Sequence, residues 1–214
     1  MEHKSIDVYL VIDTFLLLLI GIGPKIALVP FLELTSDLDA ATKSRVTRKM
    51  LTTAGVVAVV LVLLGELLAR LLHFSTGSLS VAGGIILLII SVTMVLGSGD
   101  SERDRAIRGR DPMRLAVFPL AVPYLLNPAG IVVIVTASAE AASVGVVAMV
   151  IGVLALVLVL DVVVFRWANN VSEHLDESRM LVTEKIFGFL LAALAVQLVL
   201  DGLSSVGVIH LAGH

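Results

Sequence analysis

Long apolar runs separated by short polar segments dominate the hydropathy pattern of the chain. About 20 consecutive apolar residues cross the hydrocarbon core of a bilayer, which admits only helices and closed barrels. The runs lack the apolar and polar alternation of barrel strands. The pattern therefore predicts six transmembrane helices, near residues 6–34, 46–72, 79–97, 113–139, 143–167 and 181–208.

The first and fourth predicted helices are longer than a simple crossing requires, and each contains a helix-breaking pair near its centre. These pairs are Gly23-Pro24, in "GPKI", and Asn127-Pro128, in "NPAG". Proline lacks an N–H and is best tolerated at the first position of a helix, while asparagine is a preferred N-cap and glycine an acceptable one. Each pair therefore predicts the end of one half-helix and the start of another within the membrane.

An internal repeat relates the two halves of the sequence. A shift of 104 residues places Pro24 on Pro128 and Gly84 on Gly188, and it aligns "GIILLIISV" with "GFLLAALAV". Three spans per half give the halves opposite orientations, a plan found in secondary transporters whose broken helices meet near the bilayer midplane. We expect an all-α integral membrane protein of two inverted three-helix repeats, residues 1–97 and 113–214, joined by a cytoplasmic linker at 98–112.

Composition and charge indicate the class of protein and its orientation in the membrane. The chain is 58% hydrophobic and 15% charged, with a mean hydropathy of +1.05, far outside the range of soluble domains. Twelve of its 15 lysines and arginines fall in the first, third and fifth connections. The positive-inside rule places these connections in the cytoplasm and both termini outside. We expect a multi-pass protein of the cell (inner) membrane with no nucleic acid partner. Whether it forms a homo-oligomer stays undecided.

The two breaks are the candidate binding site. A helix start leaves N–H groups at the positive end of the helix dipole, and a helix end leaves free carbonyl oxygens. Two facing breaks offer donors to a carboxylate or phosphate and acceptors to an ammonium or cation, and a small zwitterion satisfies both. The alternative is a pair of kinks whose backbone groups are satisfied by neighbouring helices. The predicted solute-binding residues here are Gly23, Pro24, Lys25, Asn127, Pro128 and Gly130.

Several other polar residues lie within predicted spans. Lys25 needs an anion or a water-filled cavity; the anion would be either a solute carboxylate or an acid from a neighbouring helix. Asp13 and Asp161 lie deep enough to be proton-coupling carboxylates or partners of Lys25. Gln197, near the middle of the last span, is a further candidate for contact with the solute.

The sequence favours a transporter over an enzyme. It has no cysteine, its five histidines lie near span ends or in connections, and it has neither an HExxH motif nor an acid cluster in a span. We therefore expect no catalytic residues, no metal site and no cofactor. Two alternatives stay open: a cation transporter that uses the broken carbonyls with Asp13 or Asp161, and an intramembrane protein acting on lipid-linked substrates.

Four segments carry a resemblance to a known family. They are "PFLELT", "VAGGIILLIISVTM", "FPLAVPYLLNPAG" and "GFLLAALAVQLVLDGL". With these, nearly the whole chain resembles the MarC family, which is related to neutral amino acid transporters and distantly similar to the lysine exporter superfamily. The resemblance implies a six-span inner-membrane protein that transports small neutral amino acids or similar organic solutes.

The breaks depart from the pattern of that family. There the first break usually reads Asn-Pro-x-Gly and the second Gly-Pro-Gly, whereas here the asparagine stands in the second break, as Asn127. Lys25 also stands where the family usually has an apolar residue. A lysine at this position favours a more acidic solute than alanine or glycine.

Overall fold

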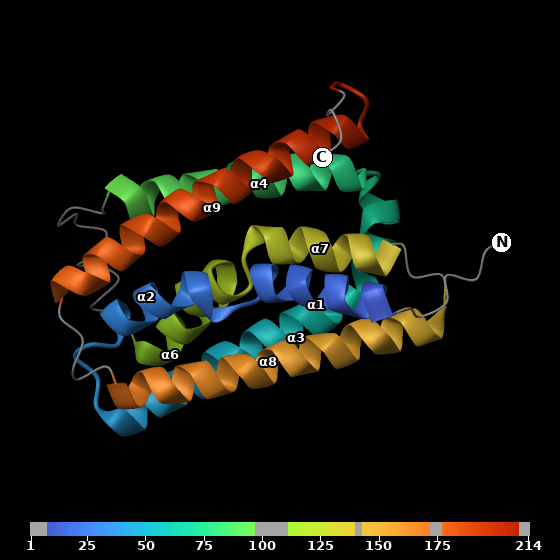
Figure 1. Ribbon diagram of the computed structural model, residues 1–214. Coiled ribbons are helices and arrows are strands. Elements are labelled where there is room, and N and C mark those ends of the chain that lie inside the picture. The colour runs from blue at the N-terminus through green and yellow to red at the C-terminus, as the bar shows by residue number, and fades with distance from the viewer. Residues whose placement is uncertain (1–7, 97–110, 140–142, 172–176, 210–214) are drawn as a thin grey trace.

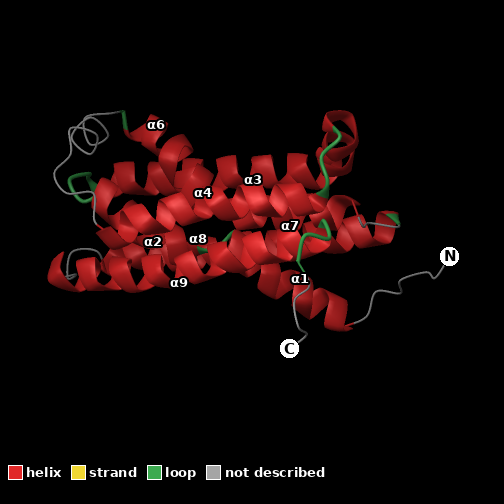
Figure 2. Cartoon of the chain, turned by 90° about the horizontal axis from the view of Figure 1, so that it is seen from above, coloured by secondary structure: helices red, strands yellow, loops and turns green. Residues whose placement is uncertain are grey.

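The computed structural model describes residues 8–96, 111–139, 143–171 and 177–209, and all its named elements are helices (Figure 2). The helices are α1 (Val8–Gly21), α2 (Pro24–Leu34), α3 (Ala40–Leu72), α4 (Thr76–Leu96), α6 (Pro112–Leu115), η1 (Ala116–Leu125), α7 (Pro128–Ala139), α8 (Val144–Val171) and α9 (Glu177–Ser205). Four of them, α3, α4, α8 and α9, are long and apolar enough to cross a membrane. The shorter helices α1, α6 with η1, and α7 are also apolar. The expected all-helical membrane architecture is confirmed to this extent.

Both predicted breaks divide a helix at the expected residues. The first apolar segment forms α1 and α2, and the first residue of α2 is Pro24. Gly23 precedes it in an extended conformation (φ −153°, ψ 160°), as an N-cap residue should. In the fourth segment α7 begins at Pro128, directly after Asn127. Proline therefore starts the second half-helix in both segments.

The fourth segment is less regular than the sequence analysis predicted. Upstream of Asn127, residues Ala116–Leu125 form a kinked helical segment instead of a regular α-helix. Its backbone leaves helical angles at Phe118 and Val122, and the peptide bonds after these two residues, to Pro119 and Pro123, are cis. Proline removes a helical hydrogen bond and disfavours the helical conformation in the residue before it. The prediction of a single break in this segment was incomplete.

The helices form three layers, with the broken helices in the middle one (Figure 1). α3 and α8 cover one side of the broken helices, and α4 and α9 cover the other. The larger apolar cluster joins the broken helices to α3 and α8 through buried side chains such as Phe31, Met50 and Phe165. A smaller cluster, with Leu87 and Leu191, joins them to α4 and α9. The breaks therefore lie inside the molecule.

The outward faces of the outer helices are strongly apolar. Exposed side chains include Leu63, Leu67 and Leu71 on α3 and Phe189 and Leu190 on α9. A soluble protein rarely exposes apolar surface of this extent, whereas hydrocarbon is its natural surrounding. These faces fit a protein embedded in lipid.

Elements related by the shift of 104 residues pack against each other. The shift carries Pro24, which begins α2, onto Pro128, which begins α7, and Val8, which begins α1, onto Pro112, which begins α6. It also relates α3 to α8 and α4 to α9, and each of these pairs is in contact. The long helices of the two halves are therefore neighbours in space, α3 with α8 and α4 with α9.

Two glycine contacts between α4 and α9 repeat under the same shift. A Cβ on Gly84 would lie 2.7 Å from the carbonyl oxygen of Ala195, and a Cβ on Gly188 would lie 3.1 Å from that of Ser91. Gly188 is the equivalent of Gly84, and Ala195 is the equivalent of Ser91. Each glycine therefore allows the same close approach of the opposite helix.

The N-caps of α3 and α8 are also equivalent positions. Asp39 accepts a hydrogen bond from the Thr42 backbone N–H at 3.1 Å, and Ser143 Oγ accepts one from the Val146 N–H at 3.4 Å. The side-chain and backbone hydrogen bonds from Thr42 hold the pKa of the Asp39 carboxyl below its ordinary value of 3.8.

The predicted linker, residues 98–112, lies outside the described residues except for its last two.

Candidate functional site at the crossing of two helix breaks

The two breaks lie directly against each other in the middle layer. Ile22 and Leu126 pair as an isolated antiparallel bridge, and the shift of 104 residues makes them equivalent positions. The Asn127 backbone N–H donates to the Gly21 carbonyl oxygen at 3.0 Å. Ile22, Leu126 and Asn127 are all fully buried. The chain therefore crosses itself at its two breaks with backbone in contact with backbone.

Asn127 satisfies both sides of this crossing with one side chain. Its Nδ2 donates to the Ile20 carbonyl oxygen at 2.9 Å, and its Oδ1 accepts from the Gly130 N–H at 3.0 Å. The first bond pairs a carbonyl at the end of α1, and the second caps the start of α7. The second break is thus closed by its own N-cap residue.

Two glycines permit the close approach of α1 and α7. A Cβ on Gly21 would overlap the Cα of Gly130, and a Cβ on Gly130 would overlap the carbonyl group of Gly21. Backbone atoms cannot move aside as a flexible side chain does, so both positions require glycine. The sequence analysis singled out Gly130 and missed Gly21, since a glycine in an apolar run gives no signal of its partner.

The first break is finished differently. Gly23 has no side chain with which to cap α2, and Pro24 at the first position has no N–H. The remaining N–H groups of the first turn have no acceptor within the helix. Lys25 follows, with its side chain exposed. A Cβ on Gly23 would overlap the Leu19 carbonyl oxygen, so the position has no room for a capping residue.

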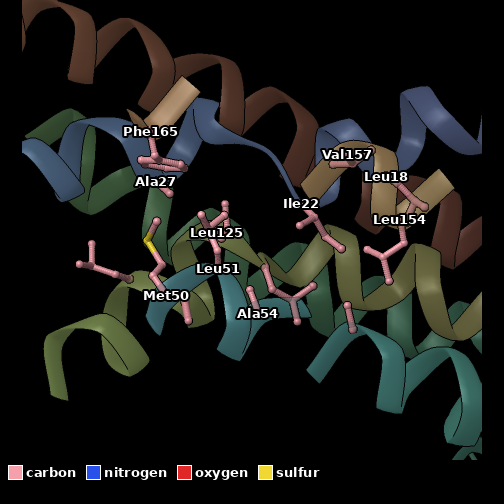
Figure 3. Packing of buried hydrophobic residues seen from close by; sticks show 14 of the residues in the cluster. Leu18, Ile22, Ala27, Met50, Leu51, Ala54, Leu125, Leu154, Val157 and Phe165 are labelled. Atoms are coloured by element: carbon pink, nitrogen blue, oxygen red, sulfur yellow. The ribbon is translucent and has the colours of Figure 1, made fainter. Parts of the chain in front are cut away.

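Asp161 lies on α8, which packs against both α1 and α2. Its side chain is fully buried, and within the described ranges neither carboxylate oxygen has a hydrogen-bond partner. One helical turn away on the same face of α8, the Phe165 ring packs edge-on against Phe31 of α2, with ring centroids 5.1 Å apart. One turn in the other direction lies Val157, and Figure 3 shows Ile22 between the levels of Phe165 and Val157. Asp161, between these two residues on α8, therefore lies at the level of the junction of α1 and α2.

The structure gathers most, but not all, of the predicted site residues. Gly23 and Pro24 adjoin the crossing that Asn127, Pro128 and Gly130 complete. Asp13, on α1, has an exposed side chain. Gln197 is also exposed, and its Nε2 donates to Asp201 Oδ1 on the same helix at 2.7 Å. The roles proposed for Asp13 and Gln197 stay predictions.

The donors and acceptors of the site are mainly backbone groups. Across the four described ranges, no group of three or more histidine, aspartate or glutamate side chains is arranged to hold a metal ion. The ionisable side chains at or near the first break are Lys25 and Asp161, one of each charge. This combination suits a small solute with both an anionic and a cationic end.

Comparison with known proteins identifies relatives over most of the chain. The sequence profile of the family described as MarC family integral membrane protein matches residues 8–206. A UPF0056 membrane protein of Methanocaldococcus jannaschii is 27% identical over 184 residues, covering 85% of this chain and 90% of the relative. The UPF0056 membrane protein YvbG of Bacillus subtilis is 27% identical over 191 residues, covering 86% and 90%. No solved structure matches the chain.

Proposed function

Because the chain belongs to the MarC family of integral membrane proteins, we propose that it is a secondary transporter of small solutes. The observation that carries the proposal is the crossing of two broken helices inside a bundle of long apolar helices. Broken helices that meet within the membrane form the substrate sites of many secondary transporters. The described helices supply both features.

The proposed architecture is a six-span protein of two inverted three-helix repeats. Its support is the packing of equivalent helices, α3 with α8 and α4 with α9, and the antiparallel pairing of the equivalent residues Ile22 and Leu126. In this arrangement the halves rock against each other about the crossing, which exposes the site to one side of the membrane and then the other. The basic connections face the cytoplasm and both termini face outward, in the cell (inner) membrane.

The proposed solutes are small neutral amino acids or similar small organic acids. A solute of this class carries a carboxylate that suits the start of α2 and Lys25, and an ammonium group that suits carbonyl oxygens or a carboxylate. Asp161, buried beside the first break, supplies such a carboxylate. We propose transport without chemical conversion of the solute, so the protein is not an enzyme.

Transport by the purified protein tests this function. In liposomes it should accumulate or exchange labelled alanine, glycine or serine. Asn127→Ala, which removes the side-chain bonds at the crossing, and Lys25→Ala should both lower the rate. Gly152→Ala is the matched control, because a Cβ there meets nothing within 4 Å. Rates that stay unchanged in both test variants would contradict the assignment.

A thermal-shift screen separates this function from cation transport. A ligand that binds the folded state raises its stability in proportion to the logarithm of its concentration over Kd. Amino acids or organic acids should raise the Tm of the protein. Stabilisation by divalent metals alone would instead favour a cation transporter.

A further inference from the structure

We propose that the solute occupies the first break and not the second, and that Asp161 binds its ammonium group while the first turn of α2 binds its carboxylate. This inference rests on the proposed transport function and adds the place and the orientation of the solute. It starts from a difference between two equivalent positions. Asn127 caps the start of its helix with its side chain, whereas Gly23 has no side chain with which to do so.

At the second break, the chain itself caps the start of α7. Asn127 Oδ1 accepts the Gly130 N–H, and Asn127 Nδ2 occupies the Ile20 carbonyl oxygen. A solute at this break would have to displace two hydrogen bonds that the protein makes to itself, one of them buried and the other partly buried. Solute binding there would replace existing bonds and add none.

The first break has the opposite character. Gly23, equivalent to Asn127, offers no side-chain acceptor to the first turn of α2, whose N–H groups lie at the positive end of an 11-residue helix. A carboxylate satisfies such a turn as a capping side chain does. Lys25, in the same turn, adds a positive charge. The first turn of α2 therefore binds the anionic end of the solute.

Asp161 is the second, independent feature of this break. Its side chain is fully buried, and within the described ranges its two oxygens have no hydrogen-bond partner. Burying an unpaired charge is costly, so Asp161 needs a cationic partner whenever it is ionised, and the ammonium group of a solute supplies one. Its neighbours one turn away, Val157 and Phe165, pack at the levels of α1 and α2, so Asp161 lies at the level of the same junction.

The position of Asp161 has no counterpart in the other half of the chain. The shift of 104 residues places it on Val57 of α3, which carries no charge. The acid and the uncapped helix start therefore occur together at the first break, and neither occurs at the second. Asp13, the other acid of the predicted spans, is exposed on α1 and does not belong to this site.

Paired ligands test the assignment in the full-length protein. L-alanine and L-lactate share a methyl and a carboxylate group and differ in having an ammonium or a hydroxyl. Wild-type protein should bind alanine roughly 10- to 100-fold more tightly than lactate, because a charge-assisted hydrogen bond to a buried carboxylate is lost in lactate. In Asp161→Asn the preference should fall to within about 3-fold, mainly through weaker alanine binding.

Two further variants keep the test decisive. Asp161→Glu retains the carboxylate and should keep a preference for alanine, whereas the matched control Asp37→Asn, at an exposed aspartate between α2 and α3, should keep the wild-type preference in full. An unchanged preference in Asp161→Asn would overturn the inference, as would wild-type protein that binds both ligands equally. Wild-type protein that binds neither ligand and transports no amino acid would contradict the proposed function itself.

Discussion

The two helix breaks occupy equivalent positions in the sequence but are finished by different residues. At the second break Asn127 makes two side-chain hydrogen bonds, one to each side of the crossing. At the first break the equivalent residue is Gly23, which makes none, and the neighbouring helix α8 carries the buried Asp161. The two breaks can therefore have different roles: the second stabilises the packing of the broken helices, and the first stays available to a solute.

The largest effect is expected at the glycine contact that lets the breaks cross. A Cβ on Gly21 overlaps backbone atoms of Gly130, so Gly21→Ala should destabilise the protein by about 3 kcal/mol or more. The control Gly152→Ala adds the same methyl group where nothing lies within 4 Å. Thermal unfolding in detergent compares the two variants. Equal Tm values would show that α1 and α7 do not meet as described.

Removing the asparagine should have the next largest effect. Asn127→Ala leaves the partly buried Ile20 carbonyl and the buried Gly130 N–H without these partners, which should cost about 2 to 3 kcal/mol. Gln197→Ala deletes an exposed amide and should change stability by less than about 0.5 kcal/mol. Denaturation of both variants in the same detergent measures the difference. A loss of stability in Asn127→Ala no larger than that in Gln197→Ala would contradict the role of Asn127 in capping and joining the two breaks.

The glycines of α4 and α9 test whether the two halves pack alike. Gly84→Ala and Gly188→Ala each push a methyl group into the opposite helix, at 2.7 Å and 2.9 Å from the nearest atoms. Each should lower stability by about 1 to 2 kcal/mol. The two Tm shifts should agree, because the contacts are equivalent under the 104-residue shift. A large effect in one variant alone would speak against equivalent packing.

The breaks were predictable from the sequence because their cause is local. Proline lacks an N–H and is best tolerated at the first position of a helix, so Pro24 and Pro128 predict the two helix starts from local chemistry alone. The apolar runs predicted the long helices for the same reason, since hydrocarbon leaves the backbone few choices.

Features that depend on contacts between distant residues were not predictable. The need for glycine at position 21 arises from Gly130, more than 100 residues away. The irregular course of Ala116–Leu125, by contrast, has a local cause in Pro119 and Pro123, and the prediction of a regular helix there left these two prolines out of account. The acids Asp13 and Asp161 were indistinguishable by depth in the sequence, and only packing separates an exposed carboxylate from a buried one.

The smallest expected effect concerns the caps of α3 and α8. The pKa of Asp39 is lowered by hydrogen bonds from Thr42, so its contribution to stability is present above its ordinary value of 3.8 and is lost as the pH falls through its lower folded-state value. Ser143, the equivalent cap, does not titrate. Comparing Tm against pH for wild type and Asp39→Asn should show a small extra loss at acidic pH in wild type only. Parallel curves would contradict the capping role.

The division of work between the breaks is tested most directly by calorimetric titration of alanine into two variants. Lys25→Ala should raise the Kd for alanine about 10-fold, because the first turn of α2 loses its positive charge beside the solute carboxylate. Asn127→Ala should lower the Tm yet change the Kd by less than about 3-fold at a temperature where it is folded. The reverse result, with weakened binding in Asn127→Ala and unchanged binding in Lys25→Ala, would contradict the account.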